Sequence, residues 1–198
     1  LAHVMVFTWL EAAMARFRAA ETTEAGIASH FASLYRAAFV LSAVFLPVVG
    51  LLVWLLPVAT SLKIALAAGL IGVPVRCLVK LAQERFRAEG EVARSARLDM
   101  VTVIGGLAAG IGFAVLGLGG AAPHAGLALA PLIILPFILP GEWRQGRSAR
   151  LDPVRLKAYA GYGYPVAVGL ILAVVLASTD RFVLAAFLDE QAVGAYHA

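Results

Sequence analysis

The residues that offer chemistry in this chain are charged side chains close to or inside long apolar stretches. Arg36 stands at the start of one stretch, and Arg76 lies inside another, four residues before Lys80. Asp180 and Arg181 form an adjacent acid and base at the end of a third. Burying a charge in hydrocarbon costs at least about 2.5 kcal/mol, so each of these groups should face protein, water or lipid headgroups.

Each of these groups also has a purely structural explanation. The side chain of Arg76 can extend along the helix toward the membrane surface, and Arg36 can anchor its helix at that surface. Asp180 and Arg181 can pair with neighbouring helices, or they can form an ion pair that gates a passage. The sequence leaves these alternatives open.

The sequence contains no recognisable catalytic or metal-binding motif. It has no HExxH, no Walker loop and no GxSxG elbow. The histidines are too far apart in sequence to form a recognisable ligand set, and His124 is expected in a solvated turn. Because Cys77 is the single cysteine, neither a disulfide nor a Cys-based zinc site is predicted. We therefore expect no enzyme activity, no metal and no cofactor.

Long uncharged stretches predict the elements that position these residues. The longest, Met100 to Gly141, holds 42 residues without Asp, Glu, Lys or Arg, and its middle reads as a turn between two spans. Since about 20 apolar residues cross a hydrocarbon layer as a helix, the stretch is long enough for two crossings. We predict an all-α, polytopic transmembrane bundle with five complete spans, placed within 37–62, 62–81, the two halves of 100–141, and 158–179.

Composition agrees with a membrane protein. Hydrophobic residues make up 62% of the chain and charged residues only 14%, whereas a soluble domain carries nearly a quarter. The sequence pI near 9.6 does not indicate nucleic-acid binding, because the basic residues are gathered in short clusters between apolar runs. No nucleic-acid partner is expected, and the bilayer is the expected surroundings.

The connections between the spans alternate in charge. Basic residues fill 80–97 and 144–157, and Arg16 and Arg18 precede the first span, whereas 57–61 and 119–125 hold no charged residue. Such alternation is expected of even threading with the basic loops in the cytoplasm. In a soluble helical protein, basic residues on solvent-exposed faces would have no reason to alternate from one connection to the next.

Helix-bending and small residues lie within the predicted spans. Each proline inside a helix removes a backbone donor and favours a kink, and such helices tend to line cavities or to move. Gly106 and Gly110 form a small-residue face that allows close packing of two backbones, and Gly161, Pro165 and Gly169 are expected to repeat it. The helix-kink candidates are Pro47, Pro74, Pro131, Pro136 and Pro165.

Segments outside the complete spans carry further signals. Only about ten apolar residues precede Glu11, and a short stub follows Val193, so a partial span is expected at each end and a larger natural protein is expected. Asp152 followed by Pro153 is typical of a helix start, and a short interfacial helix is predicted to lead from there into the fifth span.

One segment carries a specific pattern, in the residues Tyr162-Gly163-Tyr164-Pro165, Ser178-Thr179-Asp180-Arg181 and Val193-Gly194-Ala195-Tyr196. It resembles the seventh helix and the start of the eighth in bacterial polysaccharide flippases of the multidrug/oligosaccharidyl-lipid/polysaccharide exporter superfamily. Trp9 and Arg16-Phe17 resemble the end of the second helix of that family, and the basic loop Gln83 to Gly90 fits its fourth-to-fifth connection.

This resemblance implies twelve or fourteen helices in two pseudo-related bundles around a central cavity. Residues 1–158 would hold most of the N-terminal bundle, from the second to the sixth helix, and 159–198 the seventh helix and the start of the eighth. The implied activity is movement of a lipid-linked oligosaccharide or polysaccharide across the bacterial inner membrane by alternating access. Arg36 and Arg76 would contact the diphosphate of a polyprenyl-linked glycan, because guanidinium groups bind phosphate in a bidentate manner. Other polysaccharide-assembly proteins are further expected partners.

Two other classes remain open. A multidrug or cation antiporter of the same superfamily should carry acidic groups inside its helices, yet the complete spans are free of Asp and Glu until Asp180. A non-transport membrane subunit of a glycan-assembly system is the other alternative. A membrane glycan enzyme should have a large outer loop with catalytic side chains, and the outer connections here are a few residues long.

Overall fold

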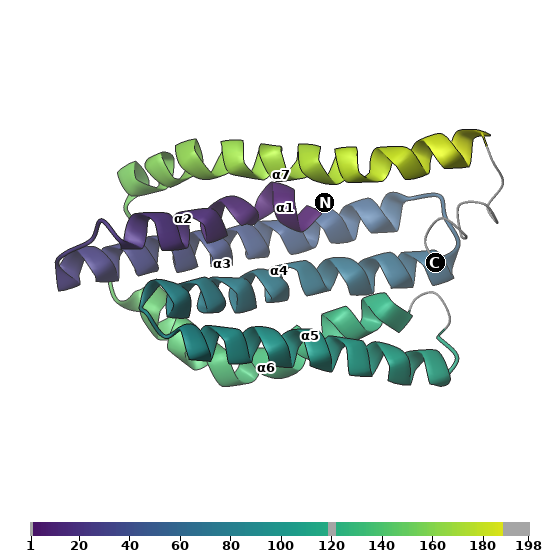
Figure 1. The fold of residues 1–198 in the computed structure, drawn as a ribbon, viewed down its shortest axis with the longest axis horizontal. Coiled ribbons are helices and arrows are strands. Elements are labelled where there is room, and N and C mark those ends of the chain that lie inside the picture. The colour runs from purple at the N-terminus through teal and green to yellow at the C-terminus, as the bar shows by residue number, and fades with distance from the viewer. Residues whose placement is uncertain (1, 119–121, 188–198) are drawn as a thin grey trace.

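A computed structural model describes residues 2–118 and 122–187, with side chains described for all of these except 60, 61, 64, 65, 68, 178 and 180–187. Within these residues the regular structure is entirely helical, as predicted. The elements are α1 (Ala2–Val6), α2 (Thr8–Arg18), α3 (Glu24–Leu55), α4 (Thr60–Ala88), α5 (Val92–Val115), α6 (Ala122–Arg147) and α7 (Pro153–Phe187) (Figure 1).

Four of the described helical segments are long and apolar enough to cross a membrane. They are Glu24–Leu55, Val92–Val115, Ala122–Arg147 and Pro153–Ala177. Each overlaps an uncharged stretch that predicted a span, so the prediction of apolar, membrane-length helices is confirmed for these four. The second predicted span, 62–81, lies within the 29-residue helix α4, and its crossing of the membrane stays a prediction.

Several helix ends follow from local sequence. Thr23 precedes α3, and its hydroxyl accepts a hydrogen bond from the backbone N–H of Gly26, which satisfies one free donor of the first turn. Asp152 caps α7 as predicted, because its carboxylate accepts hydrogen bonds from the N–H groups of Val154 and Arg155. The short helix predicted to lead from here into the fifth span begins at Pro153 but is the first part of a longer one, since α7 runs unbroken to Phe187. Its interfacial position stays a prediction. The proposed division at 158/159 therefore falls within this helix.

The basic segment after the second span is helical rather than a loop. α4 continues to Ala88 and α5 begins at Val92, so only Glu89, Gly90 and Glu91 connect them. Gly90 has a φ of 81°, in the region that favours glycine, and this lets the chain reverse within three residues. The ion pairs Arg87–Glu84 and Arg94–Glu91, at a spacing of three residues, support the two helix ends.

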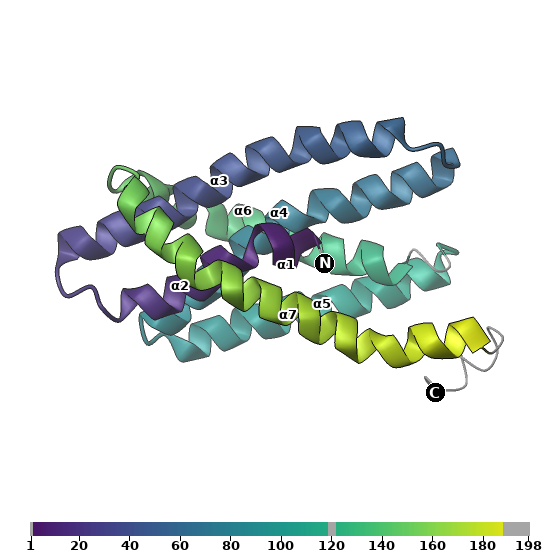
Figure 2. The same cartoon turned by 90° about the horizontal axis from the view of Figure 1, so that it is seen from above.

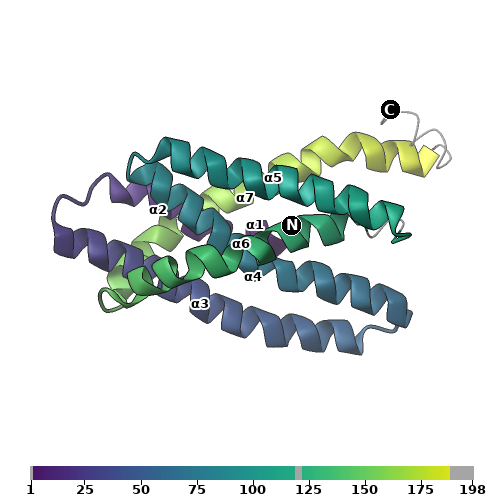
Figure 3. The same ribbon diagram turned by 90° about the horizontal axis from the view of Figure 1, so that it is seen from below.

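The helices lie side by side along the long axis of the bundle (Figures 1 and 2). The connections α2–α3, α4–α5 and α6–α7 lie at one end, which we call the basic end. The α3–α4 connection, the last turn of α5 and the first turn of α6 lie at the other, which we call the bare end (Figure 3). The segments 80–97 and 144–157, which carry the predicted basic clusters, and the end of α2 with Arg16 and Arg18 therefore lie at one end of the molecule.

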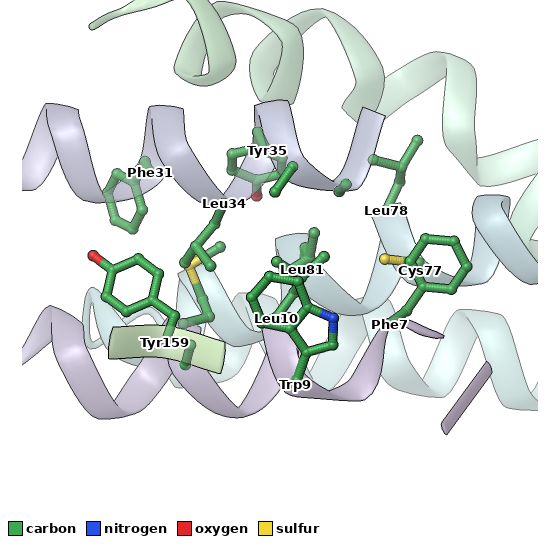
Figure 4. Packing of buried hydrophobic residues seen from close by; sticks show 14 of the residues in the cluster. Phe7, Trp9, Leu10, Phe31, Leu34, Tyr35, Cys77, Leu78, Leu81 and Tyr159 are labelled. Carbon is green, nitrogen blue, oxygen red and sulfur yellow. The ribbon is translucent and has the colours of Figure 1, made fainter. Parts of the chain in front are cut away.

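The hydrophobic core lies mainly in the half of the bundle nearer the basic end. Leu10 of α2, Leu34 of α3 and Leu81 of α4 meet there and are fully buried (Figure 4). The cluster also includes Cys77, which is completely inaccessible, and Tyr159 of α7. Cys77 is thus a packing residue. The second halves of α3, α5 and α7 instead present many exposed large apolar side chains.

Glycines allow close backbone approach at two helix crossings. A Cβ atom at Gly126 of α6 would lie 2.4 Å from the carbonyl oxygen of Gly106 and 2.4 Å from the backbone nitrogen of Gly110. The predicted small-residue face of α5 therefore packs directly on the backbone of α6. In α7 the close approach is made by Gly163 against Trp9, and not by Gly161 or Gly169, which have open space around them. That part of the glycine prediction was wrong.

Candidate functional site

Arg76 lies near the middle of α4 and lines a pocket of about 370 Å³. The pocket is bounded by α1, α4 and α6, and His3 and His124 also line it. We call it the Arg76 pocket. Arg76 makes no hydrogen bond or ion pair to any residue that the structure describes. Its guanidinium is therefore half-buried with its donors available at a pocket, which is the arrangement that could bind an anion.

His124 is exposed, but it belongs to the first turn of α6 rather than to a turn between helices. His3 forms a pair with Glu11, whose carboxylate lies 2.8 Å from its Nε2 atom. Both side chains are less than 20% exposed. The walls of the Arg76 pocket thus combine a guanidinium, two imidazoles and a nearby carboxylate.

Arg36 lies elsewhere, on α3 near the basic end. Its Nε atom donates a 2.7 Å hydrogen bond to the carbonyl oxygen of Gly146, close to the end of α6. It lines a second pocket, of about 400 Å³, with Trp143 and Arg147. We call this the Arg36 pocket. The two predicted phosphate-binding arginines therefore line different pockets, which share no residue.

The remaining predicted residues can be placed on helices. Asp180 and Arg181 lie near the end of α7, and their side chains fall outside the described part of the chain. Each predicted kink proline lies inside a helix that continues beyond it, and α6 contains a further proline, Pro140. Whether the helices bend there stays a prediction. These prolines are Pro47 in α3, Pro74 in α4, Pro131 and Pro136 in α6, and Pro165 in α7.

The most buried ion pair among the described residues joins α4 to α6. Arg85 donates from Nη2 to Oε1 of Glu142 at 2.8 Å and from Nε to Oε2 at 3.2 Å. Glu142 is only 1% exposed and Arg85 8%. A third bond, from Nη1 to Glu89 at 2.7 Å, fixes the other side of the guanidinium. This bidentate pair with an additional carboxylate holds two helices together in one geometry.

Arg85 lies beyond the predicted second span, and its charge is well compensated. Desolvation alone would lower the pKa of Arg85. The hydrogen bonds and the negative charge of Glu142 outweigh this effect, so its pKa is raised above the ordinary value. Arg85 therefore stays protonated, and its bonds to Glu142 connect α4 to α6.

A second buried polar contact joins α2, α3 and α7. His30 is completely buried, with Nε2 3.1 Å from the carbonyl oxygen of Met14 and Nδ1 2.7 Å from the hydroxyl of Tyr159. Because a carbonyl can only accept, Nε2 carries the proton. In a neutral imidazole Nδ1 then accepts from Tyr159. At the same end of the bundle, Arg155 of α7 pairs with Glu21.

Comparison with protein-family models, with curated proteins and with solved structures finds no match for this chain. The assignment of function therefore rests on the residues and their arrangement.

Sequence reasoning missed the Arg85–Glu142 pair. Arg85 was counted among several basic residues of an expected loop, and Glu142 simply ended the uncharged stretch. The two are 57 positions apart, so no local pattern joins them. One signal was present: Glu142 directly follows 42 uncharged residues, and a carboxylate at the end of such a stretch requires a partner when it is buried.

Proposed function

We propose that this chain belongs to a membrane transporter that moves a lipid-linked oligosaccharide or polysaccharide across the bacterial inner membrane by alternating access. The proposal rests on the resemblance in the seventh-helix segment, together with an all-helical bundle that contains four apolar helices of membrane-crossing length. Residues 1–158 and 159–198 would then belong to two successive bundles of a larger protein.

One observation supports the proposal most: the guanidinium of Arg76 has no partner among the described residues and lines a pocket between α1, α4 and α6. Retaining such a charge within an apolar helix is costly unless it binds something. The diphosphate of a polyprenyl-linked glycan offers the matching charge and geometry, because a guanidinium donates two parallel hydrogen bonds to phosphate oxygens. Arg36 lines a different pocket, so the two arginines would not contact the same phosphate.

Internal prolines support the transport part of the proposal. Pro74 lies two positions from Arg76, and Pro131 lies in α6, which also borders the Arg76 pocket. Both prolines are buried, and each removes one backbone hydrogen bond within its helix. Helices with such interruptions can change their bend at a low energetic cost.

The test is replacement of Arg76 in the full-length protein, with glycan export measured in cells that depend on it. Arg76→Gln should reduce export about tenfold or more at an unchanged protein level, and Arg76→Lys should restore part of it, because the positive charge returns without the bidentate geometry. Arg97→Gln is the matched control, since Arg97 is an exposed arginine of α5 outside the Arg76 pocket. Normal export by Arg76→Gln would contradict the proposal.

A multidrug or cation antiporter of the same superfamily is the second candidate, and one contact favours it. The His3–Glu11 pair beside the Arg76 pocket is a protonatable carboxylate and imidazole of the kind that ion coupling requires. If Glu11→Gln abolishes proton- or sodium-driven efflux of a cationic drug while Arg76→Gln has no effect, the antiporter is the better description. Loss of neither activity would leave a non-transport subunit.

The proposed orientation places the basic end in the cytoplasm. Reporter tags inserted at Gly90 and next to Arg150 should both report a cytoplasmic location, and a tag at Pro57 should report the opposite side. The expectation follows from the basic residues at these connections, which resist translocation. Tags at Gly90 and Arg150 on opposite faces would contradict this orientation.

A further inference from the structure

The Arg36 pocket opens at the surface of the bundle near the basic end. Its floor is the contact between α3 and the last turns of α6, where Arg36 bonds Gly146. Its walls are mostly apolar. The lining includes Phe39, Val40, Trp143 and Leu151, with Arg147 at the rim.

The charged residues that line this pocket, Arg36 and Arg147, are both basic. Arg36 uses only its Nε atom for Gly146, which leaves the two Nη groups as donors. Arg147 is exposed and makes no hydrogen bond or ion pair within the described residues. The acids nearest in sequence are already engaged, since Glu142 binds Arg85 and Asp152 pairs with Arg155. No acidic residue lines the pocket.

The apolar walls continue onto the outer surface of α3. Val40 is 58% exposed and Trp143 51% exposed, and the Trp143 ring packs edge-on against Phe39 with centroids 5.0 Å apart. Exposed indole rings beside basic residues are typical of the boundary between hydrocarbon and headgroups. Phe39 and Val40 follow Arg36 by one helical turn, and Trp143 precedes Arg147 by one turn. The pocket therefore combines cationic donors with apolar side chains that lie one turn farther from the basic end.

We propose that the Arg36 pocket binds an anionic phospholipid, with its phosphate between Arg36 and Arg147 and an acyl chain along Phe39 and Val40. A net-negative headgroup fits better than a zwitterionic one, because two guanidiniums without an acid repel a headgroup ammonium. The site holds a resident lipid at the junction of α3 and α6. The inference requires only that these helices lie in a bilayer, and it is independent of the transported substrate.

Trp143 provides a direct measurement. The purified chain is reconstituted in phosphatidylcholine vesicles that contain a small fraction of lipid with brominated acyl chains, which quench nearby indoles. The chain has three tryptophans, so the Trp143 signal is obtained by subtracting the fluorescence of Trp143→Phe. Brominated phosphatidylglycerol should quench this signal more strongly than brominated phosphatidylcholine at the same mole fraction. Equal quenching by the two lipids would overturn the proposal.

Variants identify the residues responsible. Arg147→Gln should lower the preference for phosphatidylglycerol about fivefold, the value for loss of one cation at an anionic surface. Arg147→Lys should retain most of the preference. Arg94→Gln removes an arginine from the same end of the bundle but outside the pocket, and should leave the preference unchanged. Circular dichroism checks that each variant keeps its helical content. An unchanged preference in Arg147→Gln would remove the site from this pocket.

The sources of phosphate can be separated in the same vesicles. Free pyrophosphate should not reduce quenching by phosphatidylglycerol, because the acyl groove contributes to binding. A preference for polyprenyl diphosphate with none for phosphatidylglycerol would overturn the lipid proposal and make this pocket a substrate contact. Trp54, which is 71% exposed near the bare end, is the internal control and should show no headgroup preference.

Discussion

The two ends of the bundle are stabilised by different interactions. Near the basic end, α2, α3, α4 and the start of α7 enclose a hydrophobic cluster, and ion pairs and buried hydrogen bonds join the helices. Toward the bare end, the helices expose large apolar side chains, for example Trp54, Leu107 and Leu176. The basic half is therefore packed like a soluble domain, whereas the bare half has surfaces that only lipid or other helices can cover.

The difference between the two ends indicates which contacts determine how the helices pack. In lipid, apolar side chains gain little by leaving hydrocarbon for a neighbouring helix, so helix association depends on close backbone contact and polar bonds. The bare half has few such polar bonds among its described residues. Lys63 makes one of them, from Nζ to the carbonyl oxygen of Trp54 at 2.8 Å. The arrangement of α2, α3, α4 and α7 should thus be set mainly from the basic end, whereas α5 and α6 also meet through the backbone contact at Gly126.

We expect the largest loss of stability from removal of the Glu142 carboxylate. Glu142→Gln breaks the bidentate pair and leaves the buried Arg85 with Glu89 as its remaining charge partner, and breaking a buried pair costs about 3 to 5 kcal/mol. Unfolding is measured by titration with sodium dodecyl sulfate in micelles, with labelling of the buried Cys77 thiol as the signal of opening. The free energy of unfolding should fall by that amount.

The double variant Arg85→Met/Glu142→Leu separates the charge effect from packing. Because both charges are absent, it should recover much of the stability lost in Glu142→Gln. Lys63→Gln is the control at the bare end and should change the free energy of unfolding by less than about 0.5 kcal/mol. A similar loss in Lys63→Gln and Glu142→Gln would contradict the proposed difference between the ends.

The α5–α6 crossing allows the contribution of a backbone contact to stability to be measured. Gly126→Ala places a methyl group 2.4 Å from two backbone atoms of α5, so the helices must separate. Overpacking of this kind should cost about 1 to 3 kcal/mol in the same titration. Gly112→Ala is the matched control in α5, because its Cβ would meet open space. It should be neutral or slightly stabilising, since alanine favours helix.

Buried hydrogen bonds at the basic end should have a smaller effect. Tyr159→Phe removes the donor to Nδ1 of His30 and leaves that buried nitrogen unsatisfied, at a cost of about 1 to 2 kcal/mol. Tyr162→Phe alters an exposed tyrosine of the same helix and should be neutral. Equal stability of the two variants would show that the His30–Tyr159 bond contributes little.

The half-exposed pair Lys80–Asp99 should show the smallest effect. Its atoms are 3.1 Å apart, but both side chains are at least 40% exposed. Asp99→Asn should therefore lower the free energy of unfolding by less than about 1 kcal/mol, and the loss should shrink at high salt. A loss as large as that of Glu142→Gln would mean that exposure does not distinguish the two pairs.

Much of the fold was predictable because lipid imposes long apolar helices. The uncharged stretches located α3, α5, α6 and α7, and Asp152 with Pro153 located the start of α7. Helix ends were less accurate near charges. α4 runs to Ala88 and α5 starts at Val92, because arginine and glutamate are good helix formers and a helix can leave the membrane without ending.

The candidate site was only partly accessible from the sequence. Arg76 could be selected, since a charge inside an apolar stretch is visible locally. The separation of Arg36 from Arg76 could not, because it depends on which side of each helix faces which neighbour. Glu142 was overlooked for the same reason: its partner is brought near by the return of α6 toward α4, and only the packed structure shows this.

The glycine contact between α5 and α6 has a mechanical consequence. Where side chains separate two helices, they can change rotamer and allow sliding, but backbone held against backbone has no such adjustable layer. The contact of Gly126 with Gly106 and Gly110 therefore makes α5 and α6 move as one unit. The short link at Gly90 connects this unit to α4, and residues 148–152 connect it to α7. Any rearrangement of the bundle would move α5 and α6 together, and the sliding surfaces would be those that this pair shares with α3 and α4.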